Sequence, residues 1–214
     1  MRNFFNPENW LWRGFGRLAD YFLLSACWFL CSIPLVTIGS ASIALYDTVA
    51  HCVRGNEGQM VRRFLRTFKN ELLRGFLLTV LFALLALLLN SVYQILSQMG
   101  NGSEVMRTVS VVYFCLLLLP LDCAGWCVAL ESRFVYPFGQ LLKNALAFTF
   151  GYLPQTLAIA VAFILGFNLL RMFPFLVMLV PAPMVHLQAV FIEKVFKKYM
   201  PEEEEDSIEE TTET

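Results

Sequence analysis

Hydrophobic residues are distributed unevenly along the chain, in long uncharged runs separated by short polar segments. The run Gly75–Leu89, for example, contains no charged residue. An α-helix needs about 20 apolar residues to cross roughly 30 Å of hydrocarbon. This pattern predicts membrane spans near residues 75–96, 107–130, 145–167 and 172–192, together with an earlier apolar stretch at 18–33 that Pro34 ends.

The segment 36–53 is ambiguous, because it carries Asp47 and His51 among its apolar residues. Alone it resembles a weak span or an interfacial helix. Lys and Arg cluster before residue 18, between 54 and 74, and after 192, and the positive-inside tendency places all three clusters in the cytoplasm. An even number of crossings must then separate the first two clusters. A hairpin that turns at Pro34–Gly39 supplies it.

We therefore expect an all-α, polytopic transmembrane helical bundle with six helices and both termini in the cytoplasm. The alternative has five spans and an amino terminus outside. Residues 1–200 would form a single transmembrane domain with spans at about 18–33, 36–53, 75–96, 107–130, 145–167 and 172–192, and residues 201–214 would form an acidic, disordered tail.

Short amphipathic stretches precede the third and fifth predicted spans. Phe64 and Phe68 lie four residues apart and are followed by Asn70, and Phe134 and Phe138 repeat the spacing. Residues four apart share one face of a helix. We expect interfacial elbow helices, with the Phe rings in the acyl chains and the basic groups at the lipid headgroups. Chance explains the likeness of the two stretches equally well, since the chain has 20 Phe.

Composition and charge support a membrane protein. Hydrophobic residues make up 57% and charged residues 15% of the chain, against about 45–50% and about 25% in soluble domains. Eight of the 17 acidic residues lie in 201–214, which leaves 9 acidic against 16 basic residues in 1–200. The basic body suits the anionic lipid bilayer of a cytoplasmic leaflet. No basic stripe with interleaved aromatic residues is present, which argues against nucleic acid as a partner.

Four polar residues within the predicted spans are candidate ligand-binding or structural groups: Asp47, His51, Asn90 and Asp122. A charge within a span costs at least about 2.5 kcal/mol, so it usually faces a partner or a cavity. Asp47 and His51 are four apart on one helical face. One hypothesis is that these groups converge on a polar cavity. The other is that helix–helix hydrogen bonds or interfacial water satisfy each group separately.

Pro34, Thr37 and Gly39 mark the predicted turn. Pro lacks a backbone donor, and Gly adopts conformations that are unfavourable for other residues. The segment is either a broken-helix binding site or a hairpin turn capped by Thr37 or Ser40, and we favour the turn.

Signals for catalysis, metals and cofactors are missing from the sequence. There is no nucleophile elbow, no zinc-protease motif and no P-loop, and the chain has two His. The six Cys lie mostly in apolar runs without accompanying ligands, which suits a packing role. We expect no enzymatic activity, no metal and no cofactor.

Several residues in the amino-terminal third form a recognisable set: Gly16-x3-Asp20, Trp28, Pro34-x-x-Thr37-x-Gly39, Ala44-Leu45-Tyr46 and Phe64-x3-Phe68-x-Asn70. Over about residues 10–75 the chain resembles the YesL-like family of bacterial integral membrane proteins, although Ser25 stands where such proteins often have Asn. The resemblance implies a multi-pass protein of the bacterial cytoplasmic membrane with unestablished activity and no catalytic residues to carry over.

Genes of that family often lie near ABC-type sugar importers. The resemblance therefore suggests a non-catalytic accessory or regulatory role in carbohydrate uptake, with the permease subunits of such an importer as partners. The alternative is a small-solute transporter or channel with a polar intramembrane cavity.

Overall fold

The computed structural model describes residues 10–53, 59–99, 104–105, 108–109, 112–113, 118–134 and 136–196. This part of the chain is helical and contains no β-strand, which confirms the all-α prediction for these residues. Its α-helices are α1 (Trp10–Ser32), α2 (Ile38–Thr48), α3 (Met60–Asn70), α4 (Leu72–Met99), α6 (Leu118–Arg133), α7 (Phe138–Gly151), α8 (Leu153–Met172) and α9 (Pro181–Phe196). The predicted acidic tail, 201–214, and most of 107–117 lie outside the described residues.

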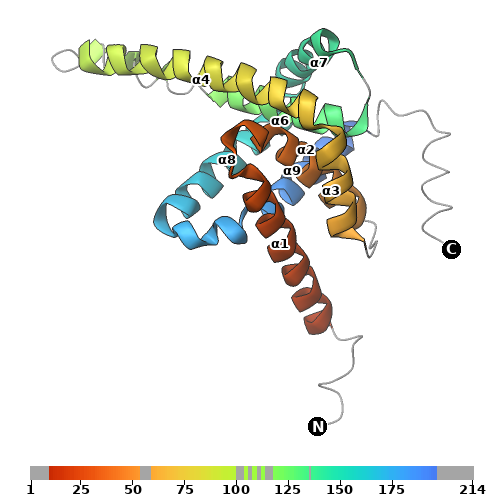
Figure 1. The fold of residues 1–214 in the computed structure, drawn as a ribbon. Helices are drawn as coiled ribbons and strands as arrows, with labels where there is room; N and C mark the ends of the chain where they lie inside the picture. The colour runs from red at the N-terminus through yellow and green to blue at the C-terminus, as the bar shows by residue number, and fades with distance from the viewer. Residues whose placement is uncertain are drawn as a thin grey trace.

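Helix α2 lies at the centre of the bundle (Figure 1). It contacts α1, α3, α4, α6 and α9. From Ser40 to Thr48 every residue except Ser42 is buried. Most of these residues are small or β-branched, so neighbouring helices approach closely. A π-helical turn, Val49–Val53, continues α2.

The turn between α1 and α2 forms the predicted hairpin. Leu35–Thr37 is a short 3-10 helix. The Thr37 hydroxyl donates to the carbonyl of Cys31 at 2.6 Å and lies 2.9 Å from that of Pro34. Thr37 thus satisfies a carbonyl in the last turn of α1, and its side chain does not cap α2. Pro34 and Thr37 therefore lie in the turn that connects α1 to α2.

Gly39 lies at a close approach between the backbones of α2 and α4. A Cβ at Gly39 would lie 2.3 Å from the carbonyl oxygen of Gly75. The Gly39 amide donates to Thr79 Oγ1 at 2.8 Å, and the Ser40 hydroxyl donates to the Leu72 carbonyl at 3.1 Å. Gly39 is therefore required for close approach, not for an unusual backbone conformation.

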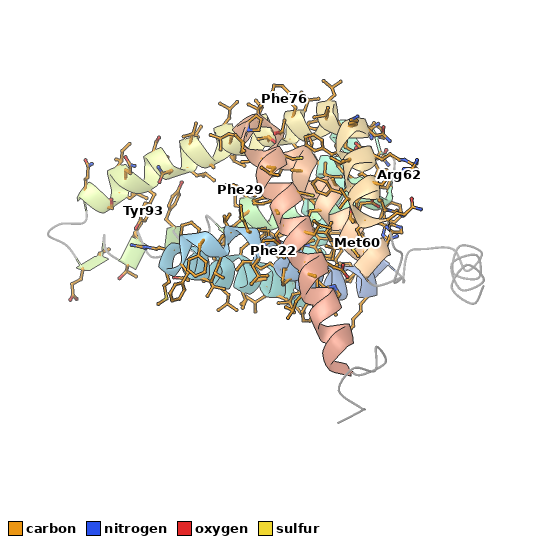
Figure 2. All side chains as sticks on the ribbon, turned by 60° about the horizontal axis from the view of Figure 1, so that its bottom comes forward. Phe22, Phe29, Met60, Arg62, Phe76 and Tyr93 are labelled. Atoms are coloured by element: carbon orange, nitrogen blue, oxygen red, sulfur yellow. The ribbon has the colours of Figure 1, made fainter. Side chains whose placement is uncertain are left out.

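Helices α3 and α7 are the predicted elbows, but α3 packs differently from the expectation. Phe64 is 0% exposed and packs with Leu24, Leu45 and Val49, and Phe68 packs against the same cluster. The prediction that the Phe64 ring enters the acyl chains is therefore wrong. Figure 2 shows Arg62 pointing away from the bundle, on the opposite face of α3, and Asn70 is exposed at its end.

The second elbow also turns its first ring inward. Phe134 lies just before α7, and its ring centroid is 5.4 Å from that of Phe196. Phe134 packs against the main core cluster, whereas Phe138 is 37% exposed. Of the two rings, only Phe138 keeps a surface position.

The fifth and sixth predicted spans are interrupted. The span predicted at 145–167 is broken at Tyr152, whose φ and ψ are −121° and 57°, and α8 begins at Leu153 with Pro154 in its first turn. Pro lacks the donor that a continuous helix needs. The span predicted at 172–192 contains a 3-10 helix, Pro174–Met178, followed by α9, which begins at Pro181.

Two helices in the described part of the chain are long and apolar enough to cross a membrane: Leu72–Gln98 and Leu153–Met172. Only 11% and 28% of their apolar windows are buried, so neither resembles the core helix of a soluble protein. Leu84 and Leu87 on α4 and Leu165 on α8, for example, are more than half exposed. Figure 2 shows Phe76 on the outer side of α4. Exposed apolar surfaces of this size are typical of contact with a membrane or with another protein.

Candidate functional site: a buried charge network

Charged side chains from the ends of four helices meet around the carboxyl end of α2. We call the set Asp47, His51, Arg63, Thr67, Arg133, Glu193 and Tyr46 the charge network. The helical spacing of four residues places Asp47 beside His51 and Arg63 beside Thr67. The network thereby joins α2, α3, α6 and α9.

Asp47 accepts hydrogen bonds from three side chains. Arg63 donates through Nε to Oδ2 and through its terminal nitrogen to Oδ1, both at 3.0 Å. The Thr67 hydroxyl donates to Oδ2 at 2.8 Å, and His51 Nδ1 lies 3.0 Å from Oδ1. The Asp47 side chain is 8% exposed. A bidentate arginine and two further donors offset much of the desolvation cost of a buried carboxylate.

The tautomer of His51 follows from its neighbours. A terminal nitrogen of Arg133 lies 2.8 Å from His51 Nε2. Arginine can only donate, so Nε2 is the acceptor and the ring proton is on Nδ1. Nδ1 lies 3.0 Å from both the backbone carbonyl and Oδ1 of Asp47. His51 is therefore a neutral bridge that accepts from Arg133 and donates to Asp47.

Arg133 also pairs with Glu193. Its Nε and a terminal nitrogen donate to the two Glu193 oxygens at 3.1 and 2.9 Å. The Tyr46 hydroxyl adds a bond of 3.3 Å to Glu193 Oε1. The Arg133 and Glu193 side chains are 13% and 9% exposed. These contacts fix the end of α9 to α2 and α6.

A second ion pair lies at the junction of α3 and α4. Arg74 donates to Glu131 Oε1 at 2.6 Å, and the Glu131 side chain is 1% exposed. Glu71, the junction residue, is close to the same carboxylate. Burial, followed by the negative charge of Glu131, raises the pKa of Glu71 above its ordinary value. Arg74 thus forms a hydrogen bond with Glu131, and its positive charge also acts on the carboxyl group of Glu71.

The four polar residues predicted from sequence do not form one group. Asp47 and His51 bind each other, as their spacing predicts, but their other partners are Arg63, Thr67 and Arg133. Asn90 is exposed on α4. Asp122 is 3% exposed on α6, and its Oδ1 has no hydrogen-bond partner among the described residues.

A cavity of 460 Å³ lies between α1, α2, α4, α6, α8 and α9. Its wall is almost entirely apolar, with Phe82, Val128 and Phe163 among the lining residues. Asp47, His51, Asn90 and Asp122 are not among them. The described structure therefore does not join these groups through a shared polar cavity.

Sequence reasoning missed Arg63, Arg133, Glu131 and Glu193 as interior groups. The sequence predicts the basic groups of both elbows at the lipid headgroups, and it does not mark the two glutamates as candidate sites. A usable signal was present: Glu131 and Glu193 each follow an apolar stretch close to a basic residue. Carboxylates at the ends of helices can hold basic side chains inside the protein rather than at the lipid surface.

Comparison with known families links the amino-terminal part of the chain to an uncharacterised family. A family described as "Protein of unknown function, DUF624" matches residues 9–91, which include α1 to α3 and most of α4. The name YesL-like is not part of this result. Searches of curated proteins and of solved structures found no match.

Proposed function

We propose that this chain is a multi-pass protein of a bacterial cytoplasmic membrane that acts as a non-catalytic accessory or regulatory component of an ABC-type carbohydrate importer. The main observation against a transport function is that the charged groups of the charge network pair with one another. Its carboxylates accept from arginines of the same chain, which leaves them committed to structure. The link to an importer rests on the family resemblance.

The membrane placement is supported by the exposed apolar surfaces of α4 and α8. In the proposed topology six segments cross the bilayer and both termini lie in the cytoplasm. The charge network then lies at the cytoplasmic end of the bundle, since Arg63 belongs to the basic cluster between residues 54 and 74 that this topology places in the cytoplasm. Fusing a reporter that is active only in the cytoplasm to either terminus tests this topology, and inactivity at one terminus would favour five spans.

A transport function is less well supported, because the cavity between the helices is apolar. A sugar needs hydrogen-bonding groups on the walls of its path. Asp122 and Asn90, which a polar pathway would use, are not on the cavity wall. We therefore place the function in contacts with other proteins.

The decisive experiment is affinity purification of the chain from native membranes in a mild detergent, with identification of the bound proteins. We expect permease subunits of a carbohydrate importer to be enriched over an unrelated membrane protein of similar abundance that carries the same tag. Solute flux into liposomes that contain the chain alone, abolished by Asp122→Asn or Asp47→Asn, would overturn the proposal and establish a transporter.

A further inference from the structure

Small residues of two helices are part of the cavity wall. Ala83 of α4 and Ala124 and Gly125 of α6 all line it. A larger side chain at Ala83 or Ala124 would occupy part of this space. The volume of 460 Å³ falls within the range of about 300–1,000 Å³ that is usual for ligand sites. This volume is too large for an ordinary packing defect, since voids in protein interiors are seldom much larger than one water molecule.

Among the polar side chains of the described lining residues, Trp28, Ser42, Tyr46 and Thr79 have hydrogen-bond partners within the protein, and the amide of Gln188 is a further polar group on the wall. Trp28 Nε1 donates to the Ser42 hydroxyl at 3.2 Å. The Thr79 hydroxyl donates to the Gly75 carbonyl and accepts from the Gly39 amide, both at 2.8 Å. The wall therefore presents mainly carbon to an occupant. Water is a poor occupant of such a cavity, because it needs two to four polar partners.

The cavity is continuous with the apolar surface of the bundle. Among the described lining residues, Ala83 of α4, Leu121 of α6 and Phe167 of α8 are exposed, with Leu121 at 41% and Phe167 at 70%. These residues lie beside the exposed apolar faces of the two helices that are able to cross a membrane, which include Leu84 and Leu165. An occupant therefore enters from the medium that covers those faces.

We propose that the cavity holds one acyl chain of a membrane lipid, which enters from the apolar surface where Ala83 of α4, Leu121 of α6 and Phe167 of α8 are exposed. This inference rests on the membrane placement within the proposed function, but not on the importer. An acyl chain is an apolar, linear molecule, and the bilayer supplies it at the depth where α4 and α8 are exposed. The acyl chain gains little hydrophobic free energy when it leaves the bilayer for the cavity, because lipid tails are as apolar as the cavity wall. It gains the dispersion contacts that an empty void would forfeit.

The test uses Trp28, which lines the cavity, as a reporter. A bromine atom on an acyl chain quenches tryptophan fluorescence on contact. The protein with Trp10→Phe and Trp12→Phe keeps two tryptophans, Trp28 and Trp126, and Trp126 is 0% exposed. It is reconstituted into phosphatidylcholine vesicles with or without bromine at the middle of the acyl chains. We expect strong quenching in the brominated vesicles.

Two substitutions on α4 separate the cavity from the outer surface. Ala83→Phe places a ring at the mouth, whereas Ala86→Phe places the same ring on an exposed position outside the cavity wall. We expect Ala83→Phe to remove most of the quenching and Ala86→Phe to leave it unchanged. Ala124→Leu, which fills the cavity from α6, serves as a second variant if Ala83→Phe lowers the helical content measured by circular dichroism.

The outcomes distinguish this proposal from its premise. If the protein does not float with the vesicles in a density gradient, the membrane placement itself fails. If the protein floats but its fluorescence is not quenched, or if the folded cavity-filling variants are quenched as strongly as the Ala86→Phe control, the acyl-chain site is wrong and the membrane placement stands.

Discussion

Asp47→Asn is the sharpest test of the charge network. The substitution preserves the shape of the side chain but removes its charge and replaces one acceptor oxygen with a donor amide. Arg63 loses one of its two hydrogen bonds and faces that amide, and either Thr67 or His51 loses its acceptor as well. The arginine of a largely buried pair is then left without a countercharge.

The expected loss can be bounded from the exposure of the two partners. Removing one member of a buried ion pair costs roughly 3–5 kcal/mol. The Arg63 side chain is 33% exposed, so water compensates part of its lost partner. We therefore expect Asp47→Asn to lower the free energy of unfolding by about 2–3 kcal/mol, which is of the order of one or two hydrogen bonds to a charged group.

Reversible unfolding in mixed micelles, with the mole fraction of sodium dodecyl sulfate as the variable and far-ultraviolet circular dichroism as the signal, measures this loss. Arg62→Gln on the exposed face of α3 is the matched control, with an expected effect below about 0.5 kcal/mol. A double-mutant cycle of Asp47→Asn with Arg63→Gln should give a coupling energy of about 1–3 kcal/mol. A loss for Asp47→Asn no larger than that of the control would refute the buried pairing.

Three other predictions concern helix contacts and the second ion pair. Gly39→Ala should destabilise the protein by more than about 2 kcal/mol, because a Cβ there meets the Gly75 carbonyl. Gly139→Ala is the control and should leave stability unchanged, because its Cβ meets nothing within 4 Å. Equal melting temperatures of the two variants would contradict this prediction. Arg133→Lys should cost about 1–3 kcal/mol in the same detergent titration, since lysine cannot form the two parallel bonds to a carboxylate; an unchanged midpoint would count against the geometry. Because the pKa of Glu71 is raised in the fold, the folded state retains this proton more strongly than the unfolded state, so stability falls as pH rises above the unfolded value of about 4.5. Glu71→Gln should remove that part of the pH dependence and raise the melting temperature at neutral pH, and a lower melting temperature there would show that the ionised carboxylate is stabilising.

Hydropathy located the exposed helices better than the central one. The prediction of a span at 75–96 agrees with α4, because nearly every residue of that helix is apolar. Segment 36–53 looked ambiguous because α2 is covered by other helices, so it can hold Ser40, Asp47 and Thr48 wherever a neighbouring group satisfies them. The hydrophobicity of a segment reflects how much of its surface faces apolar surroundings outside the protein, whereas α2 is buried against α1, α3, α4, α6 and α9.

The interruptions within the last two predicted spans have a different cause. The average hydropathy of a segment changes little with a single residue. It therefore does not reveal the helix boundaries at Tyr152, Pro174 and Pro181. Each of these positions lies at the boundary of a helix. The pairing of Asp47 with His51 followed from a spacing of four residues, which is a local property. The pairings with Arg63, Arg133 and Glu193 depend on tertiary structure, and nothing in one sequence specifies them.

The central position of α2 determines when the molecule can be completed during synthesis. Tyr46, near the start of the chain, binds Glu193, which is 147 residues later. Ribosomes work from the amino end, so α2 leaves the exit tunnel long before α6 and α9 exist. The pairing of Asp47 with Arg63 involves only α2 and α3, so it can form before those helices emerge. The face of α2 that contacts Glu193 stays uncovered until α9 is made. Final assembly must therefore wait for nearly the last helix, and a message cut short before α9 yields a chain with an open centre.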